Sequence, residues 1–487
     1  MPDVPEVFDV AVIGAGFGGL GAALTLAERG AKVVLCEALR YPGGCASTFT
    51  RGGYAFDAGA TLLSGLGEGQ LFARWQQRHG LDLAVQWLDP VVELRAPGLH
   101  LAVPRDRDVL AARFADIPGA PRDRLASFFA LQHRVADALW PLFDDPTLLP
   151  PLDAATVLRH ARRGLAYAPV LRVLGRPLGA VLADHGLDEF APLRTYLDAV
   201  CQITVQCSAA EAEAPFALAA IDYFFRGTAH LRGGVGVLAT QLLEAFARAG
   251  GTVMLSNAVR SLGREDGVHV LHSRRGPLRA RSVVANVLPQ ALATLTGEAL
   301  APATQRLADD VARGWGAAML YLGVRAEADA PPRHLELVDD AARPFVEGNH
   351  VFVSASGADE ARAPAGQCAV TASTHVALPR GASNDAVRAA MERATESMRA
   401  TLARRAPELW SERVHELTAS PRTFERFTRR PLGAVGGAPR RAGLAAYRSL
   451  GPHEAAPGVW LVGDSVFPGQ SALAAAVGGL RTASVLR

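Results

Sequence analysis

The sequence of 487 residues predicts an α/β fold in which one parallel-sheet unit is assembled from three separated stretches of the chain. Three observations predict this fold. A strand, a glycine-rich turn, a helix and a second strand open the chain, a similar strand–helix texture returns near residue 227, and a strand, a loop and a helix close it. A helical stretch and a mixed-sheet stretch are expected between these parts.

The composition indicates a large globular protein. Hydrophobic residues make up 49% and charged residues 20%, so there is enough apolar material for a sizeable core. The formal net charge of +2 gives no reason to expect nucleic acid as a partner. The 5 cysteines are scattered, without CxxC or zinc-ligand spacing, so we expect reduced thiols and no metal site. Lys32 is the only lysine, which excludes chemistry that needs a lysine elsewhere in the chain.

The first element is the apolar run VFDVAVIG, which predicts a buried parallel strand. GAGFGG follows it, with Gly14 for a tight turn, Gly16 for close approach of the backbone to a pyrophosphate, and Gly19 for close packing of helix on strand. The following helix directs free N–H groups towards the phosphates. Glu37 ends the next predicted strand and is placed to accept hydrogen bonds from ribose hydroxyls. Because an acid there disfavours a 2′-phosphate, the pattern favours FAD or NAD over NADP.

A second glycine pair selects FAD between these two cofactors. Gly43 and Gly44 follow the acid closely, in Arg40-Tyr41-Pro42-Gly43-Gly44, which resembles the R-x-x-G-G pattern of flavoproteins with two dinucleotide-binding segments. Such a pair lets the backbone pass close to a long, extended cofactor. The alternative interpretation of the two glycines is an ordinary turn.

The stretch from Leu83 to Leu218 is predicted to be mostly helical, with proline breaks. Between residues 151 and 180 it carries 5 arginines against Asp153, interleaved with leucines and valines. A basic amphipathic segment over residues 155–186 fits a bilayer interface, and it equally fits a solvated helix face over an apolar core. From residue 227, a glycine turn, a helix, the strand TVMLS and an extended piece beginning at Val259 predict a return to the first sheet.

The last part of the chain predicts a second sheet and then the end of the first. Residues 300–450 combine the strands VFVSASG and CAVTAST with a helix near 386–406, and end in PRTFERFTRRPLGAVGGAPRR, either a loop facing a cavity or a solvated loop. Gly463 and Asp464 then end a strand, where open α/β sheets bind ligands. Asp464 suits ribityl or ribose hydroxyls, the alternative being a helix cap. A helix of small residues from about Ser471 is expected to direct its N-terminus at the flavin pyrimidine.

The pieces GGCASTFTRGGYAFDAGAT, HLRGGVGVLATQL and VGDSVFPGQS resemble the carotenoid desaturase/isomerase family, the phytoene desaturase-like branch of the amine-oxidase-like FAD superfamily. VGDSVFPGQ resembles the carotenoid isomerase and carotenoid 3′,4′-desaturase branches most. GGCASTF together with PRTFERFTRRPLGAVGG resembles the 3′,4′-desaturase branch. The resemblance implies a two-dinucleotide-binding, Rossmann-like FAD domain, an inserted mixed-sheet substrate domain and a helical lid or membrane-facing subdomain. The expected segments are an FAD-binding domain at 1–82, 219–300 and 451–487, a helical insert at 83–218, and the substrate domain at 301–450.

Family members bind FAD non-covalently, hold a long hydrophobic polyene over the flavin, and associate peripherally with membranes. The resemblance therefore implies a cytoplasmic protein at the inner face of the membrane, with oxygen or a quinone as electron acceptor. Gly14, Gly16, Gly19 and Glu37 would hold the ADP half of FAD, and Val259 would contact adenine through its backbone. The remaining implied contacts, along the pyrophosphate, ribityl chain and flavin, are Gly43, Gly44, Thr61, Gly463, Asp464 and Ser471.

The predicted function is FAD-dependent desaturation of an acyclic carotenoid, with hydride transfer from an allylic carbon to flavin N5. The alternative is a carotenoid cis–trans isomerase that uses reduced FAD. A flavin amine oxidase is disfavoured because many of these enzymes use a lysine–water contact at N5, and a non-catalytic flavin- or carotenoid-binding protein is the remaining alternative. No catalytic residue is predicted; His230 could take a proton, but a structural role is favoured for it.

Overall fold

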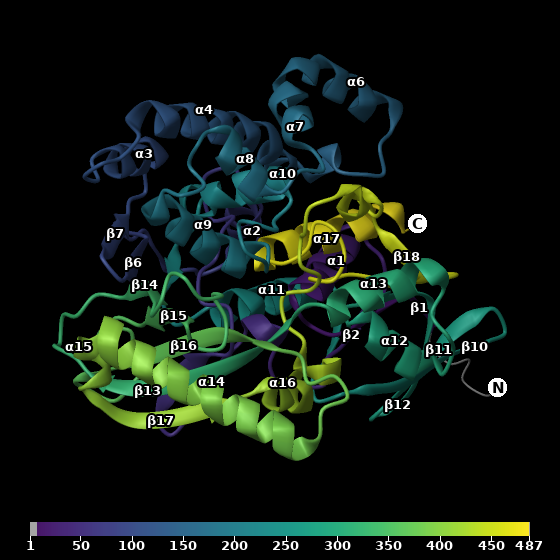
Figure 1. Cartoon of the computed structure of the whole chain (residues 1–487). Helices are drawn as coiled ribbons and strands as arrows, with labels where there is room; N and C mark the ends of the chain where they lie inside the picture. The colour runs from purple at the N-terminus through teal and green to yellow at the C-terminus, as the bar shows by residue number, and fades with distance from the viewer. Residues whose placement is uncertain (1–6, 487) are drawn as a thin grey trace.

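The computed structural model describes residues 7–486, so residues 1–6 of the first predicted FAD-binding segment lie outside the described residues. Over the described part the chain builds two large sheets, with helices on both and a helical region above them (Figure 1). The α/β fold class predicted from the sequence is confirmed. The predicted domain boundaries stay a prediction.

The first sheet has eight strands among the described residues, and its path runs β10-β11-β12-β1-β2-β9, with β19 beside β12 and β18 beside β19. Strands β19, β12, β1, β2 and β9 are parallel, whereas β10, β11 and β18 pair antiparallel. The strands are β1 (Val7–Ile13), β2 (Val33–Cys36), β9 (Thr252–Met254), β10 (Val259–Glu265), β11 (Val268–Ser273), β12 (Gly276–Ala285), β18 (His453–Ala456) and β19 (Val459–Leu461). The apolar run of β1 therefore lies between two parallel neighbours in the sheet centre, as its composition predicts.

Three helices from distant parts of the chain cover one face of this sheet: α1 (Phe17–Glu28), α11 (Gly236–Arg248) and α17 (Ala472–Val485). Helices α1 and α17 lie side by side (Figure 1). Their backbones approach so closely that a Cβ on Gly479 would lie 2.0 Å from the carbonyl oxygen of Gly18. The small residues predicted at the C-terminal end of the chain thus allow its two ends to meet.

The second sheet has seven strands within residues 7–486, in the order β17-β13-β16-β15-β14-β6-β7. Its strands are β6 (Val92–Ala96), β7 (Leu99–Val103), β13 (Trp315–Arg325), β14 (Arg333–Val338), β15 (His350–Ala355), β16 (Gln367–Ala377) and β17 (Arg413–Ala419). Helix α14 (Asn384–Arg405) packs Met398 and Leu402 on one face, against Leu320 and Val370. The other face of the second sheet is not covered by α14.

The helical region differs from the sequence prediction at its start. β6 and β7 lie within the stretch predicted as mostly helical, and they join the second sheet. In β6 buried and half-buried residues alternate, which is strand periodicity, and Pro97-Gly98 supplies the hairpin turn. The helices that follow are α3 (Arg107–Ala115), α4 (Arg122–Leu139), α5 (Pro141–Asp144), α6 (Ala154–Arg162), α7 (Ala168–Val173), α8 (Leu178–Asp184), α9 (Ala191–Thr204) and α10 (Ala214–Ile221).

Smaller elements complete the fold. The remaining helices are α2 (Leu71–His79), α12 (Pro289–Thr296), α13 (Pro302–Ala312), α15 (Pro407–Trp410) and α16 (Pro421–Thr428). Two short sheets pair β3 (Thr48–Arg51) with β4 (Tyr54–Asp57), and β5 (Val85–Gln86) with β8 (His230–Leu231). The 3-10 segments are 44–46, 146–148, 164–167, 222–225, 431–433 and 444–447. Among the described residues, no helix is both long and apolar enough to cross a bilayer.

Candidate functional site

A cavity of about 800 Å³ extends from the carboxyl ends of β1 and β2 to the space between α10 and the second sheet. Its first part is lined by turns of the first sheet and by the N-terminal ends of α1 and α17. Its second part is lined by helices α9 and α10 and by strands β13, β15 and β16. The two parts are called here the dinucleotide end and the apolar end.

The glycine turn after β1 forms the wall of the dinucleotide end. Gly14 has a φ of +95°, which L side chains rarely adopt, and Gly16 is the N-cap of α1 without a side-chain cap. The N–H groups of the first helical turn are therefore available to an anion. A Cβ on Gly16 would lie 2.4 Å from the side-chain nitrogen of Asn286. Gly19 lies behind this wall, where a Cβ would meet the carbonyl oxygen of Gly14 at 2.1 Å, as a packing role requires.

Glu37 follows β2 directly and lines the cavity. Its Oε2 accepts a hydrogen bond from the backbone N–H of Ala15 at 2.7 Å, and its Oε1 accepts one from Leu39 at 2.8 Å. Burial raises the pKa of this carboxyl above its ordinary value, although the backbone N–H groups oppose the shift. Each oxygen has a second lone pair, so the orientation fixed by the backbone leaves acceptors for ribose hydroxyls.

The other predicted cofactor contacts come from four further segments and line the same cavity: Gly43, Gly44, Thr61, Val259, Gly463, Asp464 and Ser471. The hydroxyl of Ser471 accepts a hydrogen bond from the N–H of Ala474 at 3.0 Å, so it caps α17. Gly14 and Asp464, from opposite ends of the chain, thus border one cavity. That these residues contact the cofactor stays a prediction.

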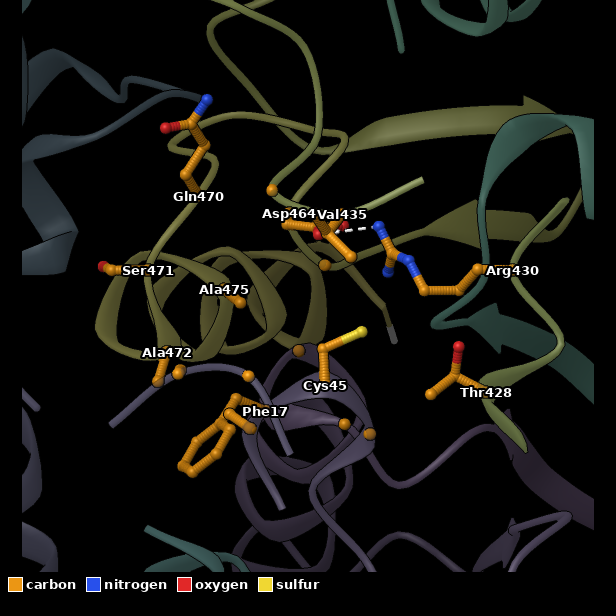
Figure 2. Close-up of a pocket in the computed structure, with 18 of the residues that line it drawn as sticks. Phe17, Cys45, Thr428, Arg430, Val435, Asp464, Gln470, Ser471, Ala472 and Ala475 are labelled. Atoms are coloured by element: carbon orange, nitrogen blue, oxygen red, sulfur yellow. Dashed lines mark hydrogen bonds and ion pairs between the residues drawn. The ribbon is translucent and has the colours of Figure 1, made fainter. Parts of the chain in front are cut away.

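Sequence reasoning missed Arg430 as a partner of the site. Its Nη2 donates to Oδ2 of Asp464 at 2.7 Å, and its side chain extends from the loop after α16 towards Asp464, with Cys45 and Thr428 nearby (Figure 2). Burial lowers the pKa of Arg430, but the Asp464 carboxylate outweighs it and leaves the pKa raised. Asp464 therefore does not act as a helix cap.

The stretch 421–441 was predicted as a loop, but it begins with helix α16, because Ser420 and Thr423 form a capping box and Pro421 occupies the first turn. The rest of the stretch is a loop, and it faces the cavity.

Asn286 is the second residue that the motifs did not reveal. It follows β12 and its N–H donates to the carbonyl of Ile13 at 2.8 Å. Its side chain lies against Gly16 and Gly18 on one side and Gly463 on the other. No motif in the sequence singles out this position.

The dinucleotide end fits FAD on these observations. Four features line one cavity. They are the glycine turn after β1, the N-terminus of α1 without a side-chain cap, the oriented carboxylate after β2, and the N-terminus of α17. Backbone N–H groups suit the diphosphate, and acidic side chains suit sugar hydroxyls.

The apolar end is lined mostly by apolar side chains. Helices α9 and α10, with the residues after them, contribute Ile203, Phe216, Ala219, Ala220 and Tyr223, and the second sheet contributes Ala317, Met319 and Phe352. Trp140 and Phe143 extend this wall from the end of α4. Such a lining favours an apolar ligand, since a charged one would lose its hydration without compensation.

His230 does not line this cavity. It is buried, with Nε2 at 2.8 Å from Oε1 of Glu360 and Nδ1 at 3.3 Å from Nε2 of His334. These contacts tie β8 to the second sheet, so the structural role favoured from the sequence fits its surroundings.

A family model described as flavin containing amine oxidoreductase matches residues 17–483. The chain belongs to this family. A prolycopene isomerase of Arabidopsis thaliana is 25% identical over 98% of this chain and 82% of its own length. A neurosporene-forming phytoene desaturase of Cereibacter sphaeroides is 32% identical over 24% of each chain. In fold, the flavoprotein matches wild-type putrescine oxidase bound to putrescine with a TM-score of 0.64 at 16% identity, over 99% of both chains.

These comparisons confirm the FAD cofactor and an FAD-dependent oxidoreductase of the carotenoid desaturase/isomerase type. The likeness to putrescine oxidase concerns the fold alone. The single lysine of the flavoprotein, Lys32, has its Nζ 5.6 Å from the centre of the Phe8 ring, in the turn before β2, and it is not part of the cavity wall. The reasoning that disfavours lysine-assisted amine oxidation is therefore consistent with where the residue lies.

Proposed function

We propose that the flavoprotein is a carotenoid desaturase that removes two hydrogens from an acyclic polyene. The observation that carries the proposal is the single cavity in which a dinucleotide end continues into an apolar end. Bound FAD supplies the hydride acceptor, N5 of its ring. The chain's own residues bind and orient the substrate and exclude water from it. Phe216, Ala219 and Ala220 of α10 and Ala317 and Met319 of β13 line the apolar end for this purpose.

The alternative is a carotenoid cis–trans isomerase that needs reduced FAD. It is favoured by the prolycopene isomerase relative, which aligns over 98% of this chain. Both reactions use the same apolar wall, and they differ in whether the product has lost hydrogen.

One experiment separates the two reactions. Purified protein with FAD is incubated with phytoene or prolycopene in liposomes, with oxygen or a quinone as the proposed electron acceptor, and with dithionite-reduced FAD in a second arm. Products are measured by mass and absorption spectrum. Loss of 2 hydrogens with a red shift supports desaturation, and unchanged mass with reduced FAD supports isomerisation. Conversion of neither polyene contradicts the proposal.

We further propose that the protein binds the inner face of the membrane in the cytoplasm through its α6–α7 lobe, residues 152–176. This lobe projects from the helical region (Figure 1). Leu165 is 93% and Leu171 66% exposed, and Leu152, Val157 and Leu158 are also exposed. Arg162 and Arg172 are exposed and form no ion pair within the described residues. Exposed leucines with unpaired arginines suit an interface rich in anionic lipid.

Flotation with vesicles tests this surface. Wild-type protein is expected to float with vesicles containing anionic phosphatidylglycerol, and much less with phosphatidylcholine alone. Leu165→Asp with Leu171→Asp should abolish flotation, whereas Val414→Asp, which alters an exposed apolar residue on β17 of the second sheet, should have a smaller effect. Equal flotation of the wild-type protein and the double variant would contradict the assignment of the lobe.

A further inference from the structure

The desaturation proposed above requires a proton acceptor, because hydride loss from one carbon must be followed by proton loss from its neighbour before the new double bond forms. FAD accounts for the hydride and its electron pair. A proton acceptor of this kind must be a titratable side chain on the cavity wall.

The acidic and thiol groups of the wall are poorly suited. Glu37 is held by two backbone N–H groups at the dinucleotide end, and Asp464 is paired with Arg430. Burial raises the pKa of Cys36 to about 11 and also raises the pKa of Cys45, so both thiols stay protonated. Arginine guanidinium groups are always charged and accept nothing.

Two further titratable groups face the apolar end, Tyr223 and His375. The hydroxyl of Tyr223 donates to the carbonyl oxygen of Leu62 at 3.2 Å, and burial raises its pKa, which keeps it a protonated phenol. His375 lies on β16, opposite Ala317 of β13. Side chains of a strand alternate between faces, and Val370, Ala372 and Val376 pack under α14, so Ser373 and His375 belong to the cavity face.

His375 is half-buried, and its ring nitrogens make no hydrogen bond within the part of the chain that the structure describes. Its neighbour is the indole of Trp315, in an edge-to-face arrangement with ring centres 6.4 Å apart. Trp315 is itself fixed by a hydrogen bond from Nε1 to the carbonyl of Gln206 at 2.9 Å. This contrasts with His230 and His350, whose ring nitrogens are engaged by Glu360 and Glu336.

We propose that His375 is the catalytic base of the desaturation, resting on the proposed function. A ring nitrogen takes the proton from the carbon next to the one that loses its hydride, the C–H electron pair becomes the new C=C bond, and the imidazole becomes imidazolium. The proton then leaves to solvent when product departs. Burial and the nearby His350 lower the pKa of His375 to about 3, which keeps the ring neutral before each turnover. A weak base suffices, because hydride loss makes the neighbouring C–H strongly acidic.

The test follows anaerobic bleaching of protein-bound FAD by phytoene in liposomes. Hydride loss from the polyene is reversible until the neighbouring proton is removed, so net bleaching depends on the base. His375→Gln is expected to slow bleaching about 100-fold or more, the range for loss of a general base, with FAD affinity unchanged. His375→Ala should be equally slow and should recover partly with added imidazole, which a packing defect would not show. His272→Gln, a matched change of an exposed histidine on β11, should bleach at the wild-type rate.

The outcomes separate this inference from the proposed function. Wild-type bleaching with product of lower mass, and His375→Gln within about threefold of that rate, overturns the role of His375 alone. A slow His375→Ala variant that binds FAD normally and gains nothing from imidazole also overturns it. Wild-type protein that transfers no hydrogen from phytoene overturns both.

Discussion

The two ends of the cavity present different surfaces to a ligand. The dinucleotide end uses backbone: the Gly14–Gly19 turn, Gly43 and Gly44, and two helix N-termini. The apolar end uses side chains from α9, α10, β13, β15 and β16. Backbone recognition needs glycine at fixed local spacing, so it is visible in the sequence. Side-chain recognition depends on which distant elements meet, so its residues share no motif.

The largest effect is expected where the dinucleotide end tolerates no side chain. Gly19→Val would place a Cβ 2.1 Å from the carbonyl of Gly14 and force α1 away from β1. We expect this overpacking to cost about 3 kcal/mol and to displace the N-terminus of α1. FAD affinity should then fall by about 100-fold. Fluorescence titration of FAD measures this. Gly263→Ala, with no atom within 4 Å of the added Cβ and no positive φ, is the control and should bind normally. Normal binding by Gly19→Val would contradict the backbone argument.

The apolar end is tested by filling it. Ala220→Trp adds an indole to the α10 wall, and we expect carotenoid turnover to fall about tenfold or more while FAD affinity stays within about twofold. Turnover and FAD titration are measured on the same preparation. Ala130→Trp, on an exposed face of α4, is the matched control. If Ala220→Trp lowered FAD affinity as much as turnover, the two ends of the cavity would not bind their ligands independently.

The half-buried ion pair between Arg430 and Asp464 on the cavity wall is tested next. Asp464→Asn removes the charged partner of Arg430, a charge-assisted hydrogen bond worth about 1.5 kcal/mol, so FAD affinity should fall about tenfold. The double variant Asp464→Asn with Arg430→Gln no longer leaves a buried charge unpaired, and its thermal stability should exceed that of Asp464→Asn alone. Strictly additive losses in Tm would show that the pair is not coupled.

The smallest effect is expected at Lys32. Lys32→Arg removes the only lysine, and because this residue is not on the cavity wall, FAD affinity and turnover should stay within about twofold of wild type. The variant is compared by the same titration and product assay. Complete loss of turnover in a correctly folded Lys32→Arg variant would show that the lysine takes part in the reaction, and it would contradict the exclusion of lysine-assisted chemistry.

The sequence by itself determined the local architecture of the cofactor site. Three local patterns predict the βαβ unit and the C-terminal helix that packs on it: the spacing of glycines after β1, the acid after β2 and the small residues of α17. They are visible in the sequence because turn geometry and helix–strand packing act over a few residues. The fold class and FAD followed from these segments. The strands β6 and β7 were missed although their alternation and turn are local, because a proline-rich helical texture follows them.

Only the tertiary structure decided which side chains line the cavity. Arg430 reaches Asp464 from 34 positions away, Asn286 inserts beside Gly16, and His375 shares a wall with α10. These contacts are set by packing and by pairing between elements distant in sequence. Period-2 alternation predicts two faces for β16, but it cannot tell which face α14 covers and which one borders the cavity.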